Sequence, residues 1–154
     1  MTKPDIEQIK EDDLAALAVI AAETELFPPE LLPDLAAPAL EGHSDTIWLT
    51  AHLGGQPVGF CFAETEQLAD RVWNMRALAV SPAVQGRGVG TALVAALEYL
   101  LRQDAQRMVL VDTSGSDAFA QTRKFYEQST YAIEARIRDY WTEGDDKVIY
   151  RKTL

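Results

Sequence analysis

Residues 73–93 read WNMRALAVSPAVQGRGVGTAL and contain the strongest local signal in the chain. The first residues have the composition of a β-strand, glycine occupies every second position from 86 to 90, and apolar residues then follow at helical spacing. Glycines allow a ligand to approach the backbone closely, and the first turn of a helix leaves about four N–H groups without partners at the positive end of its dipole. The stretch therefore predicts a strand, a glycine loop and a helix that together bind a phosphate or pyrophosphate.

Three phosphate-binding patterns compete for the glycine loop, and residue spacing separates them. A Walker loop needs Gly-Lys followed by Ser or Thr, whereas here Thr91 follows Gly90 directly, so we reject it. A dinucleotide fingerprint needs G-x-G-x-x-G, and Gly86, Gly88 and Gly90 match it poorly because they give G-x-G-x-G. The third pattern is Gln/Arg-x-x-Gly-x-Gly/Ala, which residues 85–90 match.

This loop follows a strand that ends in an apolar-x-Val-x-Pro run at residues 78–82, and the two together resemble the signature of the GNAT family of N-acetyltransferases. The resemblance implies an α/β (α+β) fold in a single domain over residues 1–154, with a mixed, mostly antiparallel sheet of roughly six to seven strands flanked by about four helices. It also implies an acyltransferase that moves the acetyl group of acetyl-CoA to a primary amine of a small molecule or peptide, by direct transfer in a ternary complex.

By the same resemblance, the glycine loop and the strand before it bind acetyl-CoA. Backbone N–H groups of the loop are expected to hold the pyrophosphate, while backbone groups of Leu78 and Val80 face the pantetheine arm and the thioester. Both are also expected to be buried strand residues, and Arg87 is either a phosphate ligand or an exposed arginine. The predicted cofactor-binding residues are Leu78, Ala79, Val80, Gln85, Gly86, Arg87, Gly88, Val89, Gly90 and Thr91.

Residues 119–131 are similar to the family's second signature, a helix that ends in an aromatic-Tyr-Glu run before a strand. Tyr126 takes the position of the tyrosine that commonly protonates the leaving thiolate, and is assigned as the catalytic residue; the alternative is an aromatic that packs beside Phe125. A phenol of pKa about 10 facing a thiol of about 8.5 makes the transfer uphill by roughly 2 kcal/mol, which local hydrogen bonds can offset. The family's Gly-Phe is Thr130-Tyr131 here, so the sequence does not decide whether a tight turn follows the helix.

The general base of the site has several candidates. Family members with a glutamate on the central strand would carry it at Asn74, and asparagine cannot take a proton. Asn74 is therefore assigned to substrate binding. The base is left open between Glu64, Asp112, Glu25 and an ordered water.

Two segments are expected on the acceptor side. By resemblance, the helices between the first and second strands overhang the acceptor, so Glu25 and Phe27 are substrate-binding candidates, with a solvated helix end as the alternative. The aromatic and acidic tail adds Trp141, which could bind an amine by a cation–π contact. The alternative for this tail is a hairpin loop without a binding role, which turns at Gly144-Asp145.

The remaining patterns predict the alternation of strands and helices that is typical of α/β proteins. Pro33 and Pro38 are expected to limit residues 30–40 to short helical pieces, and Gly54-Gly55 predicts a hairpin. The expected strands are residues 5–10, 46–53, 56–63, 72–80, 108–113, 131–138 and 145–152, and the longer helices are about residues 14–25, 88–102 and 117–128.

The composition is that of a soluble globular protein, with 154 residues, 47% hydrophobic and 25% charged, and a net charge of −10. This charge disfavours nucleic acid and anionic membranes as partners, and no apolar run approaches the roughly 20 residues of a membrane span. We expect a cytoplasmic protein that binds neither nucleic acid nor membranes. Whether it forms a homodimer is left open. The single cysteine, Cys61, is expected in the core, and with His43 and His52 it does not make a metal set.

Two alternatives to an N-acetyltransferase are compatible with the sequence. A CoA-binding sensor or interaction domain would keep the phosphate loop without catalysis, which fits the asparagine at position 74. A nucleotide-binding oxidoreductase fragment would use the loop for a nicotinamide cofactor.

Overall fold

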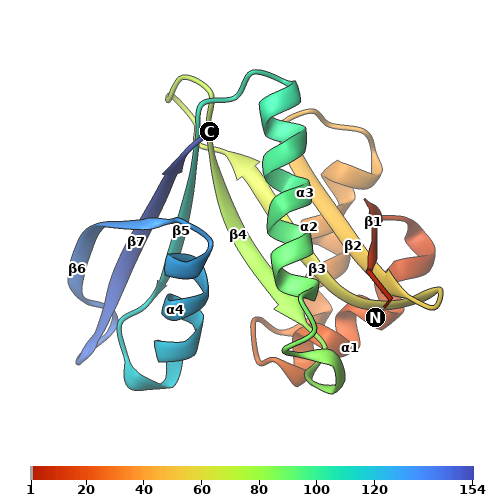
Figure 1. Ribbon diagram of the computed structural model, residues 1–154, viewed down its shortest axis with the longest axis horizontal. Helices are drawn as coiled ribbons and strands as arrows, with labels where there is room; N and C mark the ends of the chain where they lie inside the picture. The colour runs from red at the N-terminus through yellow and green to blue at the C-terminus, as the bar shows by residue number, and fades with distance from the viewer. Residues whose placement is uncertain (1) are drawn as a thin grey trace.

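The computed structural model describes residues 2–154, and within them seven strands form one sheet in the order β1-β2-β3-β4-β5-β7-β6 (Figure 1). Neighbouring strands are antiparallel except β4 and β5, which are parallel. The expected mixed, mostly antiparallel sheet is therefore confirmed. The strands are β1 (Asp5–Gln8), β2 (Thr46–Leu53), β3 (Gln56–Thr65), β4 (Val72–Val80), β5 (Met108–Ser114), β6 (Ala132–Thr142) and β7 (Asp145–Thr153).

Helices cover both faces of this sheet. In Figure 1, α3 crosses the front face with α4 beside it, and α1 and α2 lie behind. Leu97 and Tyr126 belong to the apolar cluster of the front layer, and Leu17 and Leu32 to that of the rear layer. Fully burying one such aliphatic side chain contributes about 1.5–3 kcal/mol, so these clusters hold the helices on the sheet. The helices are α1 (Leu14–Glu23), α2 (Leu32–Leu40), α3 (Val89–Gln103) and α4 (Ala120–Gln128). None of the helices within residues 2–154 is long and apolar enough to cross a membrane.

The strand β4 carries a β-bulge at Arg76. Met75 pairs with Ala63 of β3 and Ala77 pairs with Phe62, so Arg76 is an extra residue in the ladder. A bulge bends its strand and increases the local twist, and bulges are common beside active sites. The bend falls in the middle of the strand that leads to the glycine loop.

The strands β4 and β5 separate next to this bulge. Their last paired residues are Asn74 and Leu110, although β4 continues to Val80 and β5 to Ser114. Figure 1 shows the two strands diverging between α3 and α4. The separation opens a fork in the middle of the sheet.

The expectation that Pro33 and Pro38 confine residues 30–40 to short pieces is wrong, because α2 is continuous through Pro38. Pro33 lies in the first turn, where a missing N–H costs no helical hydrogen bond. Pro38 lies inside the helix, where it removes the hydrogen bond to the carbonyl four residues earlier and its ring crowds that carbonyl. Burial of Leu32 and Ala36 beneath the helix offsets this loss.

The β6–β7 hairpin turns one residue earlier than the sequence indicates. Thr142 pairs with Asp145, so the turn is Glu143-Gly144, with Gly144 in the left-handed region at φ +82°. Trp141, expected in the connecting loop, lies within β6.

A tight turn closes α4 although its left-handed residue is not glycine. Thr130 has φ +67°, its N–H donates to the Glu127 carbonyl (3.1 Å), and the Tyr131 N–H donates to the Tyr126 carbonyl (2.9 Å). This pair of hydrogen bonds is the Schellman arrangement, in which glycine usually takes the left-handed position. The tight turn therefore forms even though Thr130 replaces the family's glycine. The left-handed conformation of Thr130 costs about 1–2 kcal/mol.

We expect Thr130→Gly to stabilise the protein by up to about 1 kcal/mol, because glycine removes the Cβ strain while adding some freedom to the unfolded chain. Urea unfolding followed by circular dichroism measures the change. Ser129→Gly is the matched control: Ser129 has φ −86°, so its replacement removes no strain and should lower the free energy of unfolding. A Thr130→Gly protein less stable than wild type would contradict the assignment of strain.

Candidate active site

Between β4 and α3 the chain places two glycines in the left-handed region. Gly86 has φ +81°, and Gly88, the residue before α3, has φ +82°. The first hydrogen bond of α3 runs from the Ala92 N–H to the Gly88 carbonyl (3.0 Å), so the N–H groups of residues 89–91 have no partner within the helix. They lie at the positive end of a helix of 15 residues and suit a phosphate group.

A cavity of about 630 Å³ opens over this loop, and we call it the cofactor cavity after the ligand that the sequence predicts for the loop. Its walls are the second half of β4, the glycine loop and α4. Gly90 lies next to the Phe125 ring of α4, and a Cβ added there would be in ordinary contact with that ring at 3.4 Å. The lining residues are Leu78, Val80, Gln85, Gly86, Gly88, Val89, Gly90, Thr91, Gln121, Thr122, Phe125 and Tyr126.

Two of the predicted cofactor residues lie outside this cavity. Ala79 is buried in the rear apolar cluster, and Arg87 lines a separate, smaller cavity beside the β2–β3 hairpin. The Gln85 side chain donates a hydrogen bond to the Val80 carbonyl (3.2 Å), which ties the loop to the end of β4. Sequence reasoning missed Gln121 and Thr122, the polar residues that α4 contributes to this cavity. Only the packing of α4 near the start of α3 brings them to the loop.

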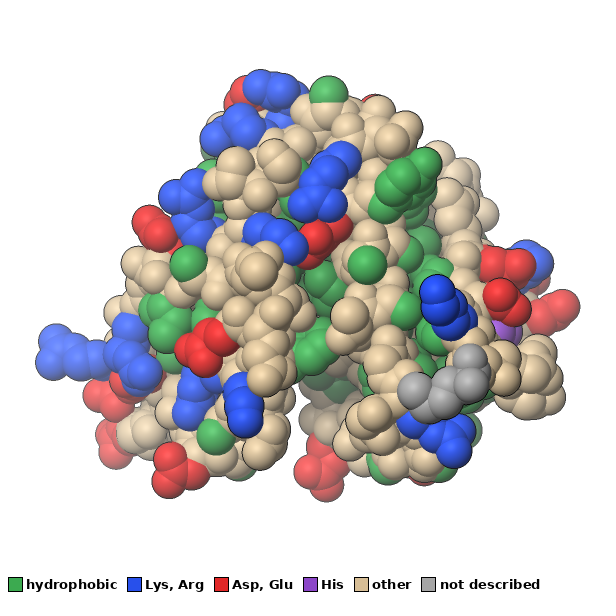
Figure 2. All heavy atoms as spheres, in the orientation of Figure 1, with side chains coloured by type: hydrophobic (Ala, Val, Ile, Leu, Met, Phe, Trp, Pro, Cys, Tyr) green, Lys and Arg blue, Asp and Glu red, His purple; other side chains and the backbone are tan. Residues whose placement is uncertain are grey.

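A second cavity of about 630 Å³ lies in the fork between β4 and β5, and we call it the acceptor cavity because two residues predicted to bind the acceptor, Glu25 and Trp141, line it. One wall is β4 from Met75 to Val80, the other is β5 from Val111 to Ser114, and the end of α1 and the β6–β7 hairpin complete it. The space-filling view is hollowed at the lower edge between α4 and the start of α3 (Figure 2). The residues that line both cavities are Leu78, Val80, Gln85, Thr122 and Tyr126.

Tyr126 lines both cavities and is otherwise enclosed. It is 5% exposed, and the rings of Phe125, Tyr131 and Tyr150 lie 5.4, 5.8 and 5.8 Å from its own, centre to centre. Burial, and then the nearby Cys61 thiol, raise the pKa of Tyr126 above its ordinary value. The phenol therefore stays protonated through the neutral range, as an acid requires. The same shift makes transfer of its proton to a thiolate more uphill than for a solvated phenol.

Arg76, the bulged residue of β4, is surrounded by carboxylates. It pairs with Glu64 (3.1 Å), Glu66 (3.4 Å) and Asp112 (3.8 Å). Arg76 and Asp112 line the acceptor cavity, whereas Glu64 and Glu66 do not. Sequence reasoning missed Arg76 and Glu66, because the bulge that brings Arg76 into this cluster depends on pairing with β3.

Asn74 lies behind this cluster and is buried, with 3% exposure. Its side-chain amide donates to Glu66 (3.0 Å) and Asp112 (3.4 Å), and its Oδ1 has no hydrogen-bond partner within residues 2–154. Lys147 adds a further cation 3.3 Å from Asp112. Asn74 therefore supports two carboxylates beside the acceptor cavity and is not among the residues that line it.

Of the other residues predicted to bind the acceptor, Glu25 and Trp141 lie in the acceptor cavity and Phe27 does not. Glu25, with φ +53° just after α1, and Trp141 both line the acceptor cavity. The Trp141 indole N–H donates to the Thr113 carbonyl (3.4 Å). Phe27 instead packs edge-on against Phe60, with 6.2 Å between the ring centres, at the border of the rear cluster.

The single cysteine lies in the core, as expected. Cys61 is a free, buried thiol, and burial raises its pKa to about 12. It is therefore neutral at physiological pH and unsuited to act as a nucleophile.

Sequence comparison relates the chain to acetyltransferases. The pattern of the Acetyltransferase (GNAT) family matches residues 9–131. A mycothiol acetyltransferase from Sanguibacter keddieii is 38% identical over an alignment of 118 residues, and the match covers 71% of this chain and 38% of that protein. The chain thus spans little more than a third of this relative's length.

Solved structures share the fold. A protein from Desulfovibrio desulfuricans assigned to the GNAT family has a TM-score of 0.91 at 23% identity, covering 98% of this chain and 99% of that one. The PaiA N-acetyltransferase of Thermoplasma acidophilum, in complex with coenzyme A, has a TM-score of 0.77 at 16% identity, covering 99% and 100%. At these identities the likeness concerns the fold.

The matched residues include the forked strand β4, the glycine loop and the helix that carries Tyr126. This chain therefore belongs to the GNAT family of acetyltransferases, whose acyl donor is acetyl-CoA.

Proposed function

We propose that this protein transfers the acetyl group of acetyl-CoA directly to a primary amine of a small molecule or peptide, with both substrates bound at once. The observation that carries the proposal is the wall shared by the cofactor and acceptor cavities at Tyr126. Donor and acceptor bound in the two cavities would meet in the β4–β5 fork. Holding reactants together in this way replaces a bimolecular encounter with a step inside one complex.

In this reaction the amine nitrogen attacks the thioester carbonyl carbon, the C–S bond breaks, and the departing thiolate takes a proton. Tyr126 is the proposed donor of that proton, because its hydroxyl-bearing ring lies where the cavities meet. The amine must lose a proton as well. Asp112 and Glu25 are the proposed bases that line the acceptor cavity, and an ordered water is the alternative.

The acceptor cavity favours a positively charged amine. Its acidic lining residues are Glu23, Glu25, Asp112 and Asp145, against Arg76 as the basic one. A cleft lined by one sign of charge raises the local concentration of ligands of the opposite sign. The half-exposed Trp141 adds an apolar and cation-binding surface.

The test is incubation with acetyl-CoA and a library of primary amines, read by release of free CoA thiol and by mass spectrometry of acetylated products. The name of the 38% identical relative adds mycothiol-related amines to this library. Retention on CoA resin with no acetylated product from any amine would instead support a CoA-binding domain without catalysis. The asparagine at position 74 is the observation that favours this second candidate.

The cofactor assignment predicts that Gly88→Ala weakens acetyl-CoA binding at least tenfold, about 1.4 kcal/mol, because a Cβ at φ +82° strains the loop that presents the N–H groups. Isothermal titration calorimetry measures the affinity. Gly42→Ala is the matched control, since Gly42 has φ +83° and equally open space but lies after α2. Equal affinities of the two variants would remove the phosphate assignment.

The acid role predicts that Tyr126→Phe lowers kcat by about 10²-fold while acetyl-CoA affinity changes little, because the ring and its packing stay and only the proton is lost. Tyr99→Phe is the control: Tyr99 is 61% exposed on α3 and should turn over as wild type. A kcat of Tyr126→Phe within about threefold of wild type would show that the tyrosine only packs and does not act as the acid.

The raised pKa of Tyr126 sets the sign of a pH effect. A general acid works below its own pKa, so a raised pKa moves the alkaline loss of kcat further up the pH scale. We expect no loss of kcat attributable to this phenol below about pH 10, its ordinary pKa. A wild-type profile that falls between pH 8 and 9, and a Tyr126→Phe profile that does not, would contradict this expectation.

A further inference from the structure

We propose that Glu98, Tyr131 and Lys152 form a buried anchor that positions Tyr126 relative to the cofactor loop. This inference rests on the proposed acid role of Tyr126. It assigns positioning residues that line neither of the two cavities.

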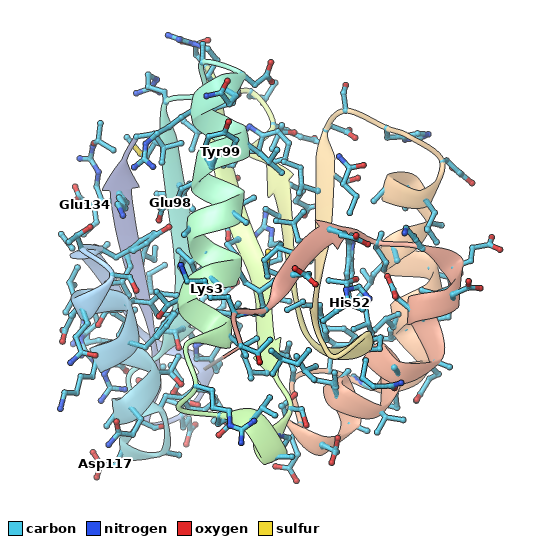
Figure 3. The ribbon with its side chains drawn as sticks, turned by 45° about the vertical axis from the view of Figure 1, so that its right-hand side comes forward. Lys3, His52, Glu98, Tyr99, Asp117 and Glu134 are labelled. Atoms are coloured by element: carbon cyan, nitrogen blue, oxygen red, sulfur yellow. The ribbon has the colours of Figure 1, made fainter. Side chains whose placement is uncertain are left out.

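Glu98 is the centre of the anchor. It is a carboxylate on α3 with 4% exposure. One of its oxygens accepts a hydrogen bond from the Tyr131 hydroxyl (2.9 Å), and the other accepts from the Lys152 ammonium (2.8 Å). In Figure 3, Glu98 lies on the side of α3 that faces β5, whereas Tyr99 is on the outer side of the same helix.

The anchor connects α3, β7 and the end of α4. Lys152 belongs to β7 and also donates to the Ser129 carbonyl (3.0 Å) at the end of α4. Tyr131 lies between α4 and β6. One buried carboxylate therefore joins α3, which begins at the glycine loop, to the last turn of α4, which carries Tyr126.

Tyr131 is the link from the anchor to Tyr126. Its N–H donates to the Tyr126 carbonyl (2.9 Å), and its ring packs edge-on against the Tyr126 ring (5.8 Å between centres, 64° between planes). On another side, Tyr150 packs against Tyr126, and its hydroxyl donates to Glu127 (3.3 Å). Two hydrogen-bonded tyrosines thus fix the backbone and the ring of Tyr126.

A role in stability alone does not account for this arrangement. A buried ion pair is often no more stabilising than apolar side chains of the same volume, because desolvation of both charges opposes their attraction. Hydrogen bonds, unlike apolar contacts, impose a direction on the groups they join. The anchor therefore fixes the distance between the cofactor loop and the Tyr126 hydroxyl, and a displacement of about 1 Å can lower a rate by 10²-fold.

The test is a double-mutant cycle on kcat with Tyr126→Phe and Tyr131→Phe, using the best amine found. Tyr131→Phe keeps the ring and loses the bond to Glu98, so kcat should fall about tenfold in the wild-type background, with unchanged acetyl-CoA affinity. In the Tyr126→Phe background the same substitution should change kcat by less than about twofold, because there is no proton left to position. A general weakening of the fold would lower kcat equally in both backgrounds.

Each outcome separates the anchor from the acid. Equal effects of Tyr131→Phe in the two backgrounds, or no effect in either, overturn the anchor while leaving the acid role intact. Wild-type turnover of the single variant Tyr126→Phe overturns the acid role, and the anchor with it.

A second pair of variants keeps the test decisive if Tyr131→Phe does not fold. Glu98→Gln retains an oxygen for the Tyr131 hydroxyl and should keep kcat within about threefold of wild type, whereas Glu98→Leu removes that oxygen and should lose about tenfold. Acetyl-CoA affinity should be the same for both. Equal kcat values for Glu98→Gln and Glu98→Leu would overturn the proposal.

Discussion

The separation of β4 from β5 after Asn74 is the constraint on which the site depends. If the parallel pairing continued to the ends of both strands, the facing edges that line the two cavities would be hydrogen-bonded to each other. An unpaired backbone group that becomes buried costs about 1–3 kcal/mol, so the open edge of β4 favours an extended ligand that supplies partners, as in strand addition. The bulge at Arg76 is the local cause, because an extra residue bends β4.

A fork in the middle of a sheet weakens the sheet, and the front apolar cluster compensates for it. That cluster contains Leu49 and Cys61 from one side of the fork, Val109 and Tyr150 from the other, and α3 side chains such as Leu97 across both. Apolar burial is non-directional, so it holds the two halves together without closing the gap between their strands. The ion pairs of Arg76 contribute less, because a guanidinium that is 38% exposed is screened by solvent. They instead keep the polar groups at the bulge satisfied.

The sequence predicts what depends on local pattern and misses what depends on pairing between distant segments. The strands at residues 46–53 and 72–80 have the expected bounds, and the glycine loop lies where expected, because alternation and glycine spacing are properties of short stretches. The bulge at Arg76 exists only in relation to β3, so nothing within β4 signals it. The family resemblance assigns Phe27 to the acceptor side, whereas packing directs it to the rear cluster. The sequence leaves Arg87 open between a phosphate ligand and an exposed arginine, and it is exposed and lines a separate cavity.

The replacement of the family's Gly-Phe by Thr130-Tyr131 is a local change in sequence with consequences for distant segments. Tyrosine in place of phenylalanine adds a hydroxyl in a buried position, and a buried hydroxyl without a partner is unfavourable, so Tyr131 requires the Glu98 carboxylate. A carboxylate with 4% exposure requires a cation in turn, and Lys152 supplies it. Loss of Glu98 leaves the buried Tyr131 hydroxyl without its partner. Loss of Tyr131 or Lys152 leaves the Glu98 carboxylate with one partner fewer, beside the more distant Arg102 (3.5 Å). The residues at positions 98, 131 and 152 therefore form one physical unit, and a change at one of them favours a compensating change at the others.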